Sequence, residues 1–88
     1  MLPLGGRPIG STVIEFTLSM TDIAKKFGKR IRMLREKKGL TQEALAFEAD
    51  LHRAYVGQIE RGEKTIGLEN IEKLAKAFQI TIAKLMDF

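Results

Sequence analysis

Arginine and glutamine side chains near the middle of the chain offer the most specific chemistry in this sequence. In a predicted helix over residues 52–61, Arg53, Ala54, Gly57 and Gln58 fall on the side that the hydrophobic residues leave free. An arginine presents a planar fork of N–H donors that matches O6 and N7 of guanine, and a glutamine amide can pair with N6 and N7 of adenine. This helix therefore carries groups suited to hydrogen bonding along the edges of bases.

Groups for catalysis or metal binding are scarce by contrast. The chain has 88 residues with one histidine, His52, and no cysteine. A single histidine cannot build a metal site alone, and no neighbouring side chain completes a nucleophile–base arrangement. The lack of cysteine excludes disulfide frameworks, iron–sulfur sites and thiolate zinc fingers, and it fits a reducing cytoplasm. We therefore expect no enzyme, no catalytic residue, no metal and no cofactor.

Positive charge is concentrated in one segment. The formal net charge is +4 and the pI about 9.6, which favours anionic partners, with nucleic acid first and acidic membrane surfaces second. Eight basic residues lie between Lys25 and Lys38, where Glu36 is the one acidic residue. Lys25 and Lys26 are expected to belong to a solvated face. No stretch approaches the roughly 20 apolar residues of a membrane helix, and no secretory signal begins the chain, so we expect a cytoplasmic protein without membrane contact.

The spacing of hydrophobic residues predicts an all-α fold of five helices. They cover about residues 22–38, 41–48, 52–61 and 68–78, with a short last helix after Thr81. Thr41 and Thr81 are expected to cap helix N-termini, and glycines 39 and 62 to end helices. The core face of the first helix is expected to consist of Ile23, Phe27, Ile31 and Leu34.

Residues 1–20 differ from the rest and are predicted to form an N-terminal arm, with the domain itself at 21–88. Pro3, Pro8 and three glycines break helices, and residues 11–18 are β-prone, with Ile14, Phe16 and Leu18 alternating. A lone strand must pair, pack or stay loose. We expect a flexible arm or a short strand that pairs with a second copy.

Two short helices joined by a tight turn are the geometry that places one helix in the major groove of DNA. Residues 41–48 and 52–61 supply both helices. The side chains expected to hold them together are Leu45, Ala46, Leu51, Val56 and Ile59.

Residues 27–85 resemble the phage Cro and repressor helix-turn-helix family, also called the XRE family. The resemblance implies a five-helix, repressor-like helix-turn-helix domain. Within that family, residues 51–56 are similar to the controller proteins of restriction–modification systems. The matching residues are Phe27-Gly28-Lys29-Arg30-Ile31, Leu34-Arg35, Gly39-Leu40-Thr41-Gln42, Leu45-Ala46, Ile59-Glu60-Arg61-Gly62 and Ile71-Leu74-Ala75.

The resemblance also implies residue roles. Arg53, Ala54 and Gln58 match base-reading positions, and Arg35 and Glu60 match an internal ion pair between the first and third helices. A helix N-terminus offers free N–H groups to phosphate, which suits the start of the second helix. The residues expected to contact the DNA backbone are Gln42, His52, Tyr55, Arg61 and Lys64.

The sequence departs from the family pattern at three positions. Asp50 replaces the usual turn glycine, although aspartate tolerates left-handed backbone better than most residues. His52 replaces the usual Ser or Thr cap, so its capping role is in doubt. Gly57 lies within a helix, where glycine costs about 1 kcal/mol against alanine, and either close approach to DNA or drift explains it.

The C-terminal residues predict a homodimer. Ile82, Leu85, Met86 and Phe88 place large apolar groups in a short segment that a domain of this size cannot fully cover, and they are the expected dimer interface. We expect a transcription regulator that binds an inverted-repeat operator in double-stranded DNA, without a small-molecule ligand.

An alternative function is a protein-interaction module such as an antitoxin, which often uses the same domain. A toxin-binding tail would then be expected beyond the domain, and little sequence follows it, whereas the N-terminal arm keeps the alternative open. An enzyme ranks a distant third.

Overall fold

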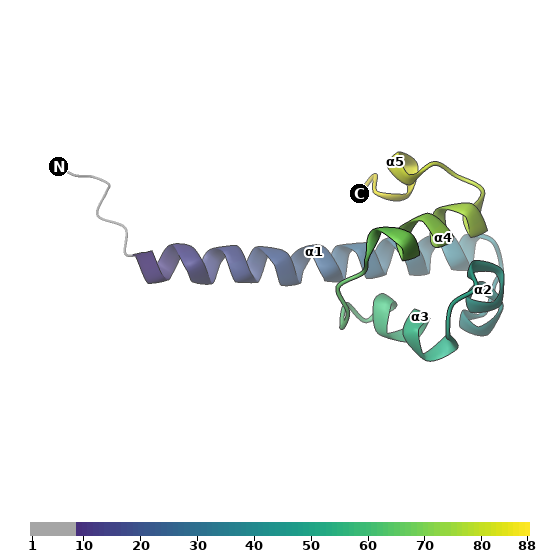
Figure 1. Cartoon of the computed structure of the whole chain (residues 1–88), viewed down its shortest axis with the longest axis horizontal. Coiled ribbons are helices and arrows are strands. Elements are labelled where there is room, and N and C mark those ends of the chain that lie inside the picture. Colours follow the sequence, from purple (N-terminus) through teal and green to yellow (C-terminus); the bar gives the residue numbers. More distant parts are fainter. Residues whose placement is uncertain (1–8) are drawn as a thin grey trace.

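The domain is built from helices gathered around one long helix (Figure 1). The structure, a computed structural model, describes the backbone of residues 9–88 and the side chains from residue 22 onward. Over this range it contains five helices, as the sequence predicted, and no strand. The helices are α1 (Ile9–Lys37), α2 (Gln42–Ala49), α3 (Arg53–Glu60), α4 (Leu68–Phe78) and α5 (Ile82–Leu85).

Local signals determine most of the helix ends. The hydroxyls of Thr41 and Thr81 accept hydrogen bonds from the backbone N–H groups of Ala44 and Lys84, each at 3.0 Å, and so cap α2 and α5 as predicted. The glycines that follow α1 and α3 adopt φ angles of 71° and 73°, a conformation that residues with a Cβ rarely adopt.

The start of α1 differs from the prediction. The helix begins at Ile9 rather than near Asp22, so residues 11–18, expected to form a flexible arm or a short strand, are helical instead. A helix satisfies its own backbone N–H and C=O groups, whereas a strand needs a partner strand, and residues 9–88 contain no strand that could pair with it. Of the predicted arm over residues 1–20, the first eight residues lie outside the described part of the chain.

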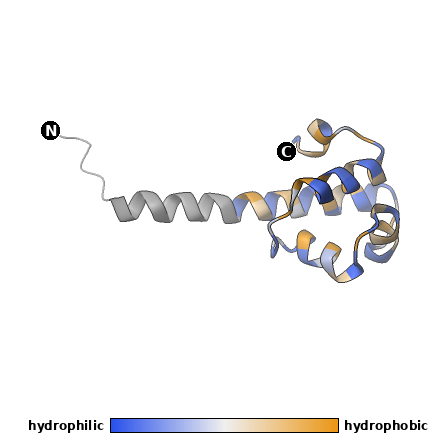
Figure 2. Ribbon diagram, in the orientation of Figure 1, coloured by the Kyte–Doolittle hydropathy of each residue, from blue (hydrophilic) through white to orange (hydrophobic). Residues whose placement is uncertain are grey.

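The hydrophobic core lies between the C-terminal half of α1 and the four shorter helices. Hydrophobic residues recur along each of these helices (Figure 2). Ile31, Leu45, Leu74 and Leu85 are fully buried, and they come from four different helices. Ile23, predicted to lie in the core, is 55% exposed, because it borders an apolar groove rather than the interior. The rest of the core consists of Phe27, Ala46, Ala49, Val56, Ile59, Ile71, Ala75, Ala77 and Phe78.

The short helix α5 is fixed to α1. Leu85 is fully buried, and the guanidinium of Arg30 donates to the backbone carbonyls of Lys84 at 2.7 Å and Leu85 at 3.2 Å. The ring of Phe88 packs on Phe27 with centroids 6.3 Å apart. Leu85 was predicted to lie in a dimer interface, which is wrong: its side chain completes the core of one chain and offers no surface to a second.

Among residues 9–88, no helix combines the length and apolar character needed to cross a membrane.

Candidate nucleic-acid interface

The turn between α2 and α3 sets the angle between these two helices. Asp50 adopts φ 56° and ψ 48°, and the N–H of Leu51 donates to the carbonyl of Ala46 at 2.8 Å. Asp50 thus adopts the left-handed conformation expected of the glycine that usually stands there. Leu45, Val56 and Ile59 are buried between the helices, so the turn and the packing together hold α3 in place.

The first turn of α3 is open to solvent. His52 is the N-cap residue, but its side chain makes no capping hydrogen bond, in line with the doubt that the sequence raised. His52, Arg53 and Ala54 are all exposed. The free N–H groups of this turn and the Arg53 guanidinium are therefore available to an acceptor outside the chain.

The solvent faces of α2 and α3 meet in a shallow hollow of about 650 Å³. The sequence-predicted residues Arg53, Ala54, Gln58, Gln42 and Arg61 all line it, so the fold brings them together. The lining is completed by Arg35, Thr41, Glu43 and Gly57.

A nearly buried ion pair ties this surface to α1. Arg35 Nε lies 2.6 Å from Glu60 Oε2, and Arg35 Nη2 lies 3.1 Å from Glu60 Oε1. The two side chains are 12% and 4% exposed. Hydrogen bonding to the Glu60 carboxylate raises the pKa of Arg35, and this effect outweighs the lowering of the pKa by desolvation. The sequence predicted this pair, and its fork geometry is the strongest available to arginine.

Gln42 is the third member of this network, which the sequence did not reveal. Its amide Nε2 donates to Glu60 Oε1 at 3.0 Å, and Arg35 Nη1 donates to the carbonyl of Leu40 at 2.7 Å. The network therefore fixes the N-terminus of α2 relative to α1 and α3. Because its side chain is engaged, Gln42 offers a phosphate chiefly the backbone N–H groups at the start of α2.

Tyr55 faces α4 rather than the hollow. It is half-buried against the core, and its hydroxyl accepts a hydrogen bond from Asn70 Nδ2 at 3.0 Å. For the DNA-backbone contact expected of Tyr55, the hydroxyl can still donate its own hydrogen to a phosphate oxygen. Asn70 was missed because the sequence gives no signal for a contact between α3 and the first turn of α4.

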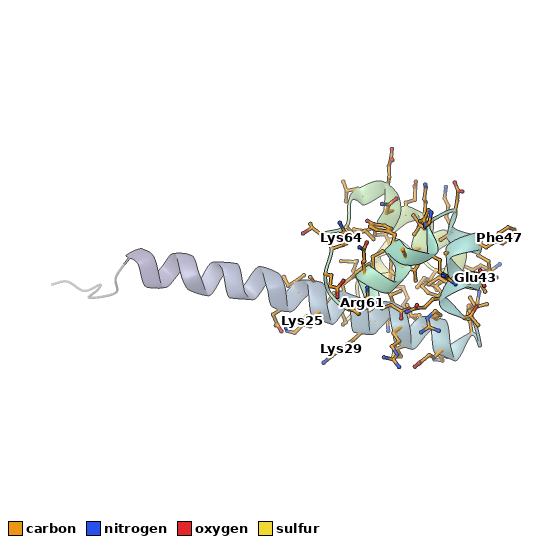
Figure 3. The ribbon with its side chains drawn as sticks, turned by 90° about the horizontal axis from the view of Figure 1, so that it is seen from below. Lys25, Lys29, Glu43, Phe47, Arg61 and Lys64 are labelled. Carbon is orange, nitrogen blue, oxygen red and sulfur yellow. The ribbon has the colours of Figure 1, made fainter. Side chains whose placement is uncertain are left out.

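Arg61 and Lys64 lie at the far end of α3 (Figure 3). Arg61 Nε pairs with Glu63 Oε2 at 2.8 Å in an exposed ion pair, which raises the pKa of Arg61 and lowers the pKa of Glu63. A Cβ on Gly57 would lie 3.1 Å from Arg61 Nη1, so Gly57 leaves room for this guanidinium. Lys64 is exposed and borders the apolar groove beside α1, not the hollow.

Comparisons with known proteins place similar chains among regulators. Residues 31–85 match a family model described as "Helix-turn-helix". The control protein C.BamHI of Bacillus amyloliquefaciens is 48% identical over 63 residues, which cover 70% of this chain and 78% of that protein. The matched residues 31–85 include all of α2 to α5.

Solved structures show the same arrangement of helices. The restriction–modification controller protein C.AhdI from Aeromonas hydrophila gives a TM-score of 0.69 at 52% sequence identity, over 70% of this chain and 94% of that chain. SinR, a master regulator for biofilm formation crystallised in complex with DNA, gives a TM-score of 0.65 at 27% identity, over 69% of this chain and 98% of that chain.

Proposed function

Because this chain belongs to the helix-turn-helix (XRE) family of transcription regulators, we propose that it binds a specific inverted-repeat operator as a homodimer. Its relatives are transcription regulators and controller proteins, and this chain is one of them rather than an enzyme. The observation that carries the proposal is the open face of α2 and α3, on which Arg53, Gln58 and the start of α2 meet.

The roles follow from the chemistry of each group. Arg53 and Gln58 contact base edges in the major groove, and the methyl group of Ala54 can pack on the C5-methyl of thymine. The N-terminus of α2, at Gln42, contacts a phosphate of one strand. Further phosphate contacts come from exposed residues around α3, namely His52, Arg61 and Lys64.

The similarity to C.BamHI and C.AhdI indicates which DNA to test first. We propose that the chain acts in the bacterial cytoplasm as a controller of restriction–modification genes, with its operator beside its own gene. Nuclease footprinting on the DNA flanking that gene should reveal one protected inverted repeat. Uniform protection, or none, would contradict a specific operator.

Replacing Arg53 with alanine should weaken operator binding by about 1–3 kcal/mol, on the order of 10- to 100-fold, because the fork that recognises guanine is lost. The fold should be unaffected, since Arg53 is exposed and makes no hydrogen bond or ion pair with a side chain from residue 22 onward. Fluorescence anisotropy on operator and mixed-sequence duplexes measures both affinities.

Arg53→Lys is the matched control, because lysine keeps the charge but not the fork. It should bind mixed-sequence DNA like the wild type and still lose most of the operator preference. Equal losses on operator and mixed-sequence DNA for the alanine variant would remove Arg53 from base recognition.

Exposed apolar side chains at the C-terminus support the homodimer. Ile82, Met86 and Phe88 remain at least one-third exposed, and Ile23 lies across an apolar groove of about 560 Å³ from Met86. Apolar groups gathered in this way usually mark a contact surface. A two-fold interface here would place two recognition helices about 34 Å apart, one turn of DNA.

Glutamate at both Met86 and Phe88 should convert the dimer to a monomer, because each charge would have to be buried in the interface. Both side chains are at least one-third exposed, and Phe88 touches the core at the ring of Phe27, whereas Leu85 is fully buried and a charge there would unfold the domain. Sedimentation velocity gives the mass, and circular dichroism verifies the fold. An unchanged dimer mass in a folded variant would place the interface elsewhere.

A further inference from the structure

The basic residues of α1 fall on separate faces of the helix. At 100° per residue, Lys25, Lys29 and Arg32 lie within about 60° of one another, and we call these three residues the α1 strip. Lys26 and Lys37 lie about 20° apart, on a neighbouring side of α1 about 100° from the middle of the strip. Arg30 and Arg35 are used inside the chain, through their bonds to α5 and to Glu60.

One end of the α1 strip, at Lys25, borders the C-terminal end of α3. A Cβ on Gly28 would touch the carbonyl oxygens of Ile59 and Glu60, so the two helices meet backbone to backbone. A Cβ on Gly62 would lie 2.8 Å from Lys25 Cγ, which places the Lys25 stem directly over the residue that follows Arg61. Viewed from the side of α3, Lys25 and Lys29 extend from the same stretch of α1, which runs past Arg61 (Figure 3).

The two lysines of the strip carry uncompensated charge within the described side chains. Lys26 lies 3.1 Å from Asp22, and Arg32 lies 3.1 Å from Glu36. Neither Lys25 nor Lys29 forms an ion pair with a residue from position 22 onward, and both are exposed. Solvation alone explains an exposed lysine, but Lys25 also lies against Gly62 at the end of the helix proposed to enter the groove, and Lys29 follows it one turn along α1.

We propose that the α1 strip, chiefly Lys25 and Lys29, binds the phosphates along one wall of the major groove that α3 enters. This inference rests on the proposed DNA binding and adds a contact surface outside the helix-turn-helix. The groove is about 12 Å wide, so the backbone beside α3 comes within reach of the helix that packs against α3. Lysine suits this task because it binds phosphate as a point charge without reading sequence.

The test compares two double variants of the whole chain that remove the same charge from different faces. Lys25→Gln with Lys29→Gln removes the two lysines of the strip, and Lys26→Gln with Lys37→Gln is the control on the neighbouring side of α1. Binding to a mixed-sequence 30-base-pair duplex is measured by anisotropy over a range of salt concentrations. Two lost phosphate contacts should reduce the slope of log K against log salt by about 1.8, and the control should keep the wild-type slope.

The operator preference should be the same for the strip variant and the wild type, because phosphate contacts carry no sequence information. Lys29→Gln alone should reduce the slope by about 0.9 and leaves the packing of Lys25 on Gly62 intact. Equal slopes for the strip and control variants, with wild-type binding present, would overturn the inference alone. Absence of wild-type binding to any duplex at low salt would overturn the proposed function as well.

An acidic membrane surface is the other anionic partner that the charge allows. Vesicles of phosphatidylserine and phosphatidylcholine therefore serve as a second probe for the same variants. Vesicle binding that depends on Lys25 and Lys29, with the DNA salt slope unchanged, would assign the strip to lipid and overturn the proposal.

Discussion

Alanine in place of either Arg35 or Glu60 should lower the free energy of unfolding by about 3–5 kcal/mol, because each change leaves the partner's charge nearly buried and unpaired. Loss of Glu60 also removes the acceptor of the Gln42 amide, and loss of Arg35 removes the donor to the Leu40 carbonyl. Urea unfolding followed by circular dichroism measures the loss.

The double alanine variant should lose less than the sum of the two single changes, since it leaves no unpaired charge. The exposed pair of Arg61 and Glu63 is the matched control, and a cycle on it should show no measurable coupling. Strict additivity at Arg35 and Glu60 would mean that the pair contributes nothing as a unit.

Gly28→Ala should destabilise the domain by about 1–3 kcal/mol, despite replacing a glycine inside a helix. Helix propensity alone would favour alanine by about 1 kcal/mol. The added methyl group, however, would overlap the Ile59 carbonyl oxygen and lie 2.6 Å from that of Glu60. Backbone atoms cannot rotate away like a side chain, so α1 and α3 must separate and the overlap outweighs the propensity gain.

Gly57→Ala provides the matched control, because Gly57 is also buried within a helix. Its new methyl group would meet the end of the Arg61 side chain at 3.1 Å, and this flexible group can move. This variant should keep or gain stability, up to about 1 kcal/mol. Thermal unfolding of both variants decides the matter: equal effects would show that helix propensity, and not the contact of α1 with α3, governs Gly28.

Local signals in the sequence were sufficient for α2 to α5. Threonine caps at positions 41 and 81, glycines after α1 and α3, and hydrophobic spacing in α4 act within a few residues of each other, so they can be found without a fold. The ion pair was predicted from the resemblance to repressors, because Arg35 and Glu60 match two paired positions of that family although 25 residues separate them.

Contacts between segments distant in the sequence could not be predicted from these local signals. The apolar character of Leu85 is equally consistent with a core or an interface, and only the packing of α5 on α1 decides between them. The hydrogen bonds of Gln42 with Glu60 and of Tyr55 with Asn70 depend on how the helices pack against one another. The start of α1 was placed too late because Ile14 and Leu18, which share one face of a strand, also lie about one turn apart on a helix.

The hydrogen bonds from Arg30 to α5 affect how DNA binding by such a protein would depend on its own concentration. They fix the last helix within a single chain, so subunits joined through Met86 and Phe88 could separate and still be folded. Below the dissociation constant of the dimer, the concentration of the paired form rises with the square of the chain concentration. Operator occupancy would then be steepest while the first copies accumulate, and the delay before its target genes respond would be set by that dissociation constant.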